Sequence, residues 1–461
     1  MLRIVSTTEG SVRGLPAADP RITSFKGIPF AQPPVGELRW RAPRPCTPYD
    51  GIRDCCEFAP ISMQSIPGLD AENIYTNEWN VDPAIAMSED CLYLNVWTPA
   101  RSPDEKLPVF VWFFGGALQW GNCAEMEFDG ERIARRGIVV VTVNYRLNVF
   151  GFLTHPKMRE EDPHTGYNLG HLDQQAGLRW VHKNIAGFGG DPDRITLGGQ
   201  SAGGGSVMAQ LNCPQNKGMI HGAIVESGVF LNPFEKTFNI TLEESIRQSL
   251  DFFSYLGVSS MEEARSLPTE YIRDKNDAFG RLWGTVIDGN FQTDTYWNNI
   301  GKRRFLDVPV LAGYTNNEFI YQDINVIELG TMRMYQERER NGYKAPQYLY
   351  EFGADIPGAD QPGAFHSVDL WFFFETLAKC SRPFQGRHYD LARKMCNYWC
   401  NFIRKGDPNG CDQDGGAMEE WAAYKENSRQ VMSFYDTPRL QYKELTERMQ
   451  SYMDQNISLF C

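Results

Sequence analysis

One serine of the chain stands in a setting suited to nucleophilic chemistry. Residues 198–204 read Gly-Gly-Gln-Ser-Ala-Gly-Gly, which places Ser201 at the centre of a Gly-x-Ser-x-Gly motif. Residues 194–197 predict a short buried strand before the motif, and residues 206–211 predict the beginning of a helix after it. A serine on such a turn presents its hydroxyl outward, and the N–H groups at a helix start stabilise negative charge. The pattern indicates attack of Ser201 on a carbonyl carbon.

The same motif could instead be a P-loop, a dinucleotide-binding loop or a plain tight turn. A P-loop ends in Gly-Lys followed by Ser or Thr, and no such ending follows this motif. A dinucleotide-binding loop reads Gly-x-Gly-x-x-Gly, with an acidic residue roughly 20 positions further on. Glu226 lies downstream, but a serine at the apex does not suit the approach of a pyrophosphate. The flanking strand and helix favour the nucleophile over a plain turn.

The base that activates the serine must be a histidine that follows an acid. A serine hydroxyl is a poor nucleophile until a base accepts its proton, and the chain order in enzymes with this turn is serine, acid, histidine. That order excludes five of the seven histidines: His155, His164, His171, His182 and His221. His388 belongs to a helical pattern and is interpreted as a core residue. His366 lies in a loop-like stretch before residues 368–374, which are rich in aromatic side chains, and is the predicted base.

Three carboxylates are candidates for the acid that orients the histidine. Glu318 comes seven residues after Leu311, just beyond a predicted strand. Asp288 precedes a glycine, as is typical of a turn. Asp323 lies farther from the strand end and is expected to be solvated. The residues favour Glu318 without excluding the other two.

The reaction also needs N–H donors for the oxyanion of the tetrahedral intermediate. The backbone N–H of Ala202, directly after the nucleophile, is one expected donor. The others are expected from a loop after an early strand. The predicted strand 109–114 is followed by Gly115, Gly116 and Ala117, and glycine lets a backbone turn its N–H groups inward.

Apolar segments predict the elements that position these groups. Strands are expected at 109–114, 139–144, 195–197, 223–225 and 308–311, and helices at 172–184 and 208–212. This alternation predicts the α/β class, with a mostly parallel central sheet, helices on both faces and long insertions. Binding sites in such sheets form at the carboxyl ends of the strands. No linker divides the chain, so a single domain is expected over residues 1–461.

Composition narrows the possible partners. The net charge of -13 argues against a nucleic-acid partner, and no apolar run approaches the roughly 18 residues that span a bilayer. The 11 cysteines are odd in number and show no zinc-type spacing with histidine. Reduced thiols are therefore expected, without a metal or a cofactor. Residues 1–10 lack the pattern of a signal peptide, which makes a cytoplasmic location the expectation.

Several longer segments resemble the type-B carboxylesterase family, whose α/β-hydrolases include cholinesterases and large fungal lipases. The segments that carry this resemblance are 25–36, 88–96 (Ser-Glu-Asp-Cys-Leu-Tyr-Leu-Asn-Val), 144–146 with 150–153, 168–174, and 188–192. They extend along nearly the whole chain. The resemblance implies a microbial serine carboxylesterase that hydrolyses small ester substrates through an acyl-enzyme, as a monomer or homodimer.

The resemblance also implies a role for individual residues. Ser201, Glu318 and His366 match the catalytic triad, and Ser227 matches a serine that lies near it. The oxyanion hole is implied to consist of the N–H groups of Gly116, Ala117 and Ala202. Two charged pairs match structural ion pairs of the family: Arg39 with Glu89, and Arg146 with Asp173.

The chain departs from the family pattern near the expected chemistry. Gln200 replaces the usual glutamate before the nucleophile, which makes a cholinesterase less suitable as an interpretation. Ala117 replaces a glycine, and family members with this loop type tend to accept bulky alcohol groups. Phe319 stands after the acid where glycine is usual. Cys91 matches a disulfide position whose partner position is Ser62, which supports a reducing compartment.

Two rival functions and a set of pocket residues complete the expectations. One rival function is a binding or adhesion protein on the same fold, but such relatives lack the catalytic serine. Another is a lipase, which needs an apolar lid, and residues 67–86 are too polar to form one.

The substrate pocket is expected to involve aromatic side chains that flank the site: Trp120, Phe230, Trp371 and Phe372. The residues Leu445, Met449, Tyr452 and Met453 predict an amphipathic helix that packs on the domain or on another subunit.

Overall fold

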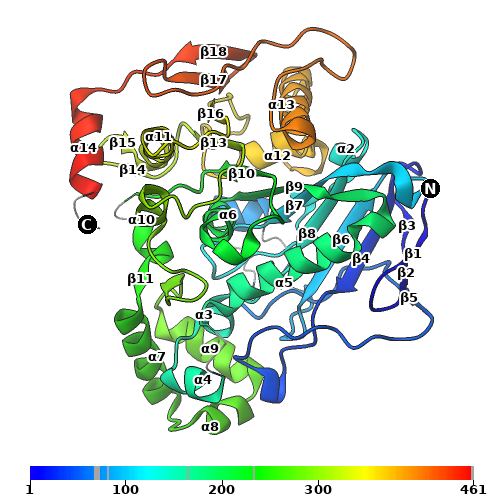
Figure 1. Cartoon of the computed structure of the whole chain (residues 1–461), viewed down its shortest axis with the longest axis vertical. Helices are drawn as coiled ribbons and strands as arrows, with labels where there is room; N and C mark the ends of the chain where they lie inside the picture. Colours follow the sequence, from blue (N-terminus) through cyan, green and yellow to red (C-terminus); the bar gives the residue numbers. More distant parts are fainter. Residues whose placement is uncertain (67–72, 80–81, 163–165, 232–233, 458–461) are drawn as a thin grey trace.

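A central sheet of eleven strands organises the molecule (Figure 1). The computed structural model describes residues 1–66, 73–79, 82–162, 166–231 and 234–457. The strand order across the sheet is β18 (Pro438–Tyr442), β17 (Gln430–Phe434), β16 (Gln347–Phe352), β13 (Val310–Thr315), β10 (Gly222–Glu226), β9 (Gly190–Gln200), β7 (Leu107–Phe113), β8 (Val139–Val143), β6 (Tyr93–Thr98), β4 (Thr23–Pro29) and β3 (Leu15–Pro16). A smaller sheet contains β1 (Ile4–Ser6), β2 (Ser11–Arg13) and β5 (Ile52–Asp54).

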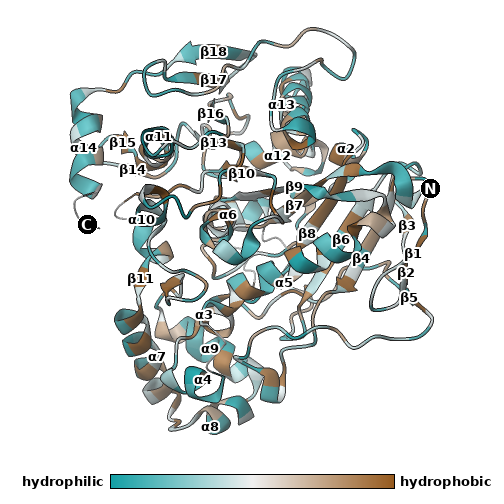
Figure 2. Cartoon of the chain, in the orientation of Figure 1, coloured by the Kyte–Doolittle hydropathy of each residue, from teal (hydrophilic) through white to brown (hydrophobic). Residues whose placement is uncertain are grey.

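The seven central strands, from β17 to β8, are parallel to one another. The pairs β17–β18, β6–β8, β4–β6 and β3–β4 at the two sides are antiparallel. Every residue of β8 is buried, as expected for a strand covered on both faces. Figure 2 shows that β7 and β8 are apolar along their length. The predicted α/β class is confirmed, with the large mixed sheet of an α/β-hydrolase.

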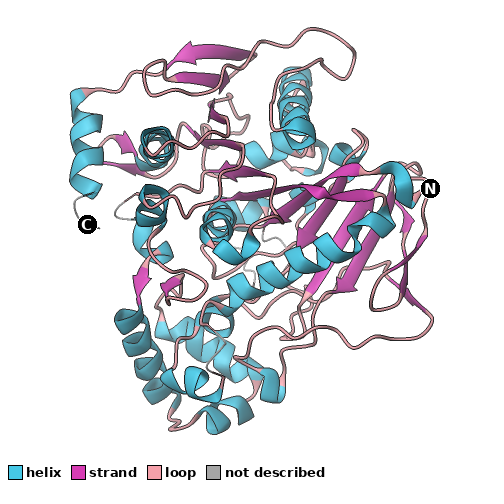
Figure 3. Ribbon diagram, in the orientation of Figure 1, coloured by secondary structure: helices cyan, strands magenta, loops and turns pink. Residues whose placement is uncertain are grey.

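Helices lie on both sides of this sheet (Figures 1 and 3). Helices α5 (Leu169–Asn184) and α6 (Ala202–Asn212) lie on one side, and α12 (Asp369–Phe373) and α13 (Gly386–Lys405) lie on the other. Helices α7 (Leu242–Leu256), α8 (Met261–Ser266) and α9 (Thr269–Phe279) form a cluster farther from the central strands. Among the described residues, no helix combines the length and apolar character needed to cross a membrane.

Both ion pairs implied by the resemblance are present in the fold. Arg39 pairs with Glu89 and Arg146 pairs with Asp173, and all four side chains are buried. Cys91 is a free, buried thiol, and Ser62 lies within hydrogen-bonding reach of it. The C-terminal helix α14 (Glu447–Ile457) packs against α11 (Val326–Arg340), so its apolar face is covered by the same chain.

Several boundaries differ from the predicted ones: β9 runs over Gly190–Gln200 and not only over 195–197, and α5 begins at Leu169 and not at 172. The strand expected at 308–311 begins at Val310 and continues to Thr315, because backbone pairing with β16 does not require apolar side chains. The helix after the serine begins at Ala202, four residues before the expected start, so that its first turn is built from three glycines. Low helix propensity is overridden there by packing against the sheet.

Candidate active site

Ser201 occupies a sharp turn between β9 and α6. Its backbone angles are φ +55° and ψ −124°, a strained conformation for a residue with a side chain. Its N–H donates to the carbonyl of Glu226 at 2.9 Å, which ties the turn to the end of β10. Ser227 follows there, fully buried and also at positive φ. The neighbouring β10 therefore holds the serine turn in place.

The glycines around Ser201 are required by close backbone approach. A Cβ atom on Gly203 would lie 2.1 Å from the carbonyl oxygen of Phe113, and one on Gly199 would lie 2.3 Å from that of Gly203. No side chain can occupy either position without displacing β7 or α6. These contacts explain the Gly-x-Ser-x-Gly spacing physically.

Glu318 and His366 lie together, although 48 residues separate them in the chain. The Nδ1 atom of His366 is hydrogen-bonded to Oε2 of Glu318. The other carboxylate oxygen accepts the N–H of Thr315 at 2.9 Å, and only 3% of Glu318 is exposed. This arrangement fixes the orientation of the imidazole ring and directs Nε2 toward the cavity that also contains Ser201.

The rival acids and the rival histidine have structural roles. Asp288 accepts the N–H groups of Asn290 and Gln292 and thereby forms a turn. The side chain of Asp323 is 91% exposed. His388 caps the beginning of α13, where Nδ1 accepts the N–H of Gln385 at 2.8 Å. None of the three reaches the serine turn.

Gln200 contacts the face of His366 that a nucleophile would use. The amide Nε2 of Gln200 lies 3.3 Å from Nε2 of His366, and an amide N–H can donate to that nitrogen. This contact requires the neutral ring with its proton on Nδ1, facing Glu318. Gln200 thus selects the same tautomer as the carboxylate does.

Phe319 adopts a conformation that usually requires glycine. Its φ is +44°, in the left-handed region, so the aromatic residue keeps the backbone path expected for a glycine. Its ring meets the ring of His366 edge to face at 4.7 Å between centroids, and Phe234 packs on it at 4.8 Å. Phe319 therefore forms a wall beside the imidazole.

The loop after β7 brings Gly116 and Ala117 to the same cavity. Gly116 has φ +102°, and a Cβ atom there would lie 2.1 Å from the carbonyl oxygen of Trp120. Ala117 also has a positive φ, of +54°. Among the described residues, no backbone carbonyl accepts the N–H of Gly116, Ala117 or Ala202. These N–H groups are available to an anion, and that of Ala202 lies at the N-terminus of α6.

A cavity of about 380 Å³ connects these groups. Its lining residues are Tyr75, Trp79, Gly115, Gly116, Ala117, Trp120, Gly121, Glu125, Glu127, Phe128, Gln200, Ser201, Phe319, His366, Ser367 and Leu370. A volume of this size holds a small organic molecule. Among the described residues, no group of three or more His, Cys, Asp or Glu side chains could hold a metal ion.

Of the aromatic residues expected in the pocket, only Trp120 lines the cavity among the described residues. Trp120 lines the cavity and is 43% exposed. Phe230 lies behind Phe319, at 5.6 Å between ring centroids. Trp371 is fully buried and stacks on Trp79, which lines the cavity in its place.

Phe372 is a correction to the expected pocket. It is fully buried against Phe352 and Phe384, because the short helix α12 turns Leu370, and not Phe372, toward the cavity. Residues 67–72 and 80–81 of the segment considered as a lid lie outside the described residues. The described residues Tyr75 and Trp79 of that segment form part of the cavity wall.

The two glutamates of the cavity were not anticipated. Glu125 and Glu127 follow the glycine loop at a spacing of two residues. Nothing in that spacing predicts that they lie near Ser201, and only the fold shows that they line the same cavity. Burial raises the pKa of Glu125 to about 7. Burial, reinforced by the neighbouring Glu125 carboxylate, raises the pKa of Glu127 well above its ordinary value.

Comparison with known proteins gives these groups a context. A model of the carboxylesterase family matches residues 2–328 and 320–453. The pyrethroid hydrolase Ces2e of Rattus norvegicus is 44% identical over 489 residues, which cover 88% of this chain and 82% of the relative. Para-nitrobenzyl esterase of Bacillus subtilis is 29% identical and covers 93% of this chain and 94% of its own. The crystal structure of the carboxylesterase EST55 of Geobacillus stearothermophilus superimposes with a TM-score of 0.82 at 28% identity, over 98% of this chain and 99% of that one.

Proposed function

Because the chain belongs to the carboxylesterase family and is a carboxylic-ester hydrolase, we propose that Ser201, Glu318 and His366 are its catalytic triad. The observation that carries the proposal is the hydrogen bond between Glu318 and His366, together with the cavity that both His366 and Ser201 line. Ser201 attacks the ester carbonyl while Nε2 of His366 accepts its proton. Formation of the C–O bond to the serine pushes the carbonyl electrons onto oxygen.

The oxyanion is stabilised by the N–H groups of Gly116, Ala117 and Ala202. These donors are fixed before the substrate binds, because the loop after β7 and the beginning of α6 are held by packing on the sheet. His366 then gives its proton to the leaving alcohol, and the C–O bond to that alcohol breaks. Water, deprotonated by the same imidazole, attacks the acyl-enzyme and releases the carboxylic acid.

Glu318 keeps His366 in the productive tautomer throughout the cycle. Its buried carboxylate accepts the Nδ1 proton and stabilises the imidazolium that forms after each proton transfer. For Ser201 to donate its proton to Nε2, its hydroxyl must take the place of the Gln200 amide, which lies 3.3 Å from that nitrogen. Ser227, which is fully buried, follows the carbonyl of Glu226 that supports the serine turn from the end of β10.

Replacement of Ser201 tests the assignment directly. We expect Ser201→Ala to lower kcat for 4-nitrophenyl acetate by several orders of magnitude, as in other triads. We also expect a fluorophosphonate to add one phosphonyl group to the peptide that contains Ser201, measured by mass spectrometry. The matched control is Ser367→Ala, since Ser367 lines the same cavity beside His366. An adduct lost in Ser367→Ala but kept in Ser201→Ala would overturn the proposal.

A further inference from the structure

A second cavity lies outside the site that contains Ser201. Its volume is about 310 Å³, and it shares no lining residue with the Ser201 cavity. Residues 30–31, which follow β4, form part of its wall together with residues 42–46, and the helix α5 forms the opposite part. The proposed ester hydrolysis makes no use of this cavity.

Much of the lining of this second cavity is apolar. Phe30 and Trp180 line it, and only 4% of each residue is exposed. The half-buried residues Pro43, Leu172 and Ala176 line it beside them. A cavity of this size with apolar walls and a few polar groups is typical of a site for a small organic molecule.

The charged residues of the lining determine the kind of molecule. Three of them are cationic, namely Arg44, Arg179 and Lys183, and Glu9 is the one carboxylate in the described lining. Cys46 is neutral, because burial and the nearby Glu9 charge raise the pKa of its thiol to about 11. Positive charges therefore outnumber negative ones at this cavity, although the net charge of the chain is -13. Such a local excess attracts an anion.

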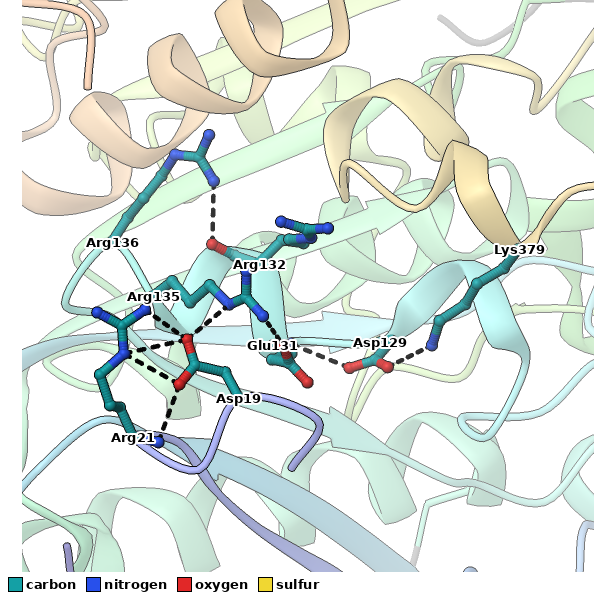
Figure 4. A network of polar contacts seen from close by, with 8 residues as sticks. All are labelled: Asp19, Arg21, Asp129, Glu131, Arg132, Arg135, Arg136 and Lys379. Carbon is teal, nitrogen blue, oxygen red and sulfur yellow. Dashed lines mark hydrogen bonds and ion pairs between the residues drawn. The ribbon is translucent and has the colours of Figure 1, made fainter. Parts of the chain in front are cut away.

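The two arginines of the cavity lack a carboxylate partner. No carboxylate of the described residues forms an ion pair with Arg44 or Arg179, and Arg179 donates only to the neutral amide of Gln215, at 3.3 Å. Exposure alone does not explain this. The side chain of Arg21 is 75% exposed and still pairs with Asp19 at 2.6 Å, and Figure 4 shows Arg135 on the same carboxylate.

Hydrogen bonds hold the walls of the cavity in place. The N–H of Gln32 donates to the carbonyl of Arg44 at 2.8 Å, which fixes residues 42–46 against the chain after β4. The indole Nε1 of Trp180 donates to Oε2 of Glu9 at 3.0 Å, and Lys183 lies 3.9 Å from the other oxygen of that carboxylate. Glu9 is thus engaged with Trp180 and Lys183, and the guanidinium groups of the two arginines are left for an anion from outside the chain.

We propose that this second cavity binds an organic carboxylate, whose charged end pairs with Arg44 and Arg179 and whose apolar body packs against Phe30 and Trp180. A guanidinium group matches the two oxygens of a carboxylate, and the apolar walls favour an anion with an apolar body over a small hydrated ion. Acids of this class are what a carboxylic-ester hydrolase releases. The inference goes beyond the proposed hydrolysis, since it uses no residue of the Ser201 cavity.

The thiol of Cys46 reports binding at this cavity alone, because Cys46 lines it and is distant from Ser201 in the fold. Alkylation of Cys46 by iodoacetamide is followed at pH 9 by mass spectrometry, and the exposed Cys411 is the internal reference. The probes are octanoate and octanamide, which have nearly the same shape and differ in charge. We expect octanoate to slow alkylation of Cys46 and not of Cys411, and to reach half of its effect at a concentration at least tenfold lower than octanamide. Equal concentrations, or no protection by octanoate, would overturn the proposal.

Variants locate the charge recognition on the two arginines. Arg44→Gln combined with Arg179→Gln should raise the half-effect concentration of octanoate at least tenfold and that of octanamide less than threefold. Each variant is compared with itself without ligand, since the charge change alters the reactivity of the thiol. Arg247→Gln is the matched control, because that arginine is 66% exposed on α7 and does not line the cavity. Both substituted arginines are exposed, so unchanged unfolding temperature and esterase activity are expected. A preference for octanoate that survives the double substitution would refute the assignment.

Discussion

The residues around the imidazole of His366 determine how the proposed base works. Glu318 and Gln200 contact its two nitrogens, and Phe319 covers its face. Of these three side chains, only Glu318 carries a charge. The ring is thus held by one carboxylate, one neutral amide and one aromatic edge, and each can be changed alone.

Gln200→Glu introduces a second carboxylate beside the ring. The added charge stabilises the imidazolium, so the neutral base is reached only at higher pH. We expect the acid limb of the kcat/KM profile for 4-nitrophenyl acetate to move upward in pH, with a smaller change at pH 9. Gln200→Met, which removes the amide without adding charge, is the control. A profile that does not move in Gln200→Glu would show that this side chain does not act on the base.

Phe319 offers a test of strain and of ring packing at one position. Glycine tolerates φ +44° without cost, whereas alanine pays roughly 1 kcal/mol there. We expect Phe319→Gly to unfold at a higher temperature than Phe319→Ala, the reverse of the usual order of these residues. Both variants should lose activity, because the ring no longer positions His366. Equal activity in the variants and the unsubstituted enzyme would mean that the ring has no positioning role.

At the scale of elements, five of the seven central strands (β7, β8, β9, β10 and β13) followed from apolar runs, since burial on both faces leaves a nearly continuous signal. The strands β16 and β17, whose sequences mix polar and apolar residues, were not expected. The strand at Val310–Thr315 was misplaced because its second half is defined by pairing with β16 and not by side-chain type. The beginning of α6 was misplaced for a related reason. Its glycines, poor in helix propensity, are selected by the closeness of β7, which only the assembled fold reveals.

The same closeness gives a prediction about the serine turn. Gly203→Ala places a methyl group 2.1 Å from the carbonyl of Phe113, so β7 and α6 must separate. We expect a large loss of stability, of several kcal/mol, and loss of esterase activity. The control is Gly386→Ala in α13, where a Cβ atom meets nothing within 4 Å. Thermal unfolding should show that variant to be as stable as the unsubstituted enzyme or slightly more stable.

At the scale of the whole molecule, the contacts that the sequence did not predict join residues that are far apart in the chain. The residues of the proposed triad could be named from the sequence, because chain order and family motifs restrict them to a few positions, and the structure brings Glu318 and His366 together. Glu125 and Glu127 could not, since 74 residues separate Glu127 from Ser201 and only the topology of β7, β9 and the 3-10 helix η3 (Met126–Phe128) brings them together. The same holds for Glu235, a carboxyl buried against Trp297 and Asn239.

Buried carboxyls such as Glu235 make the stability of the whole molecule depend on pH. Burial raises the pKa of Glu235 to about 8 from its ordinary 4.5, so between these values the folded state binds more protons than the unfolded state. The free energy of unfolding therefore decreases as the pH rises, by about 1.4 kcal/mol per pH unit for one proton. Histidines with lowered pKa, such as His171, act in the opposite direction but only below pH 6.5.

The unfolding temperature should accordingly fall between pH 6.5 and pH 8.5, measured by calorimetry at constant ionic strength. Glu235→Gln keeps the acceptor for Trp297 and Asn239 and removes the titrating proton, so its unfolding temperature should fall less steeply. Glu243→Gln, at a side chain that is 85% exposed, should retain the slope of the unsubstituted enzyme. If Glu235→Gln and Glu243→Gln show the same slope, then Glu235 is ionised in the folded protein and the cavity glutamates Glu125 and Glu127 become the next groups to substitute.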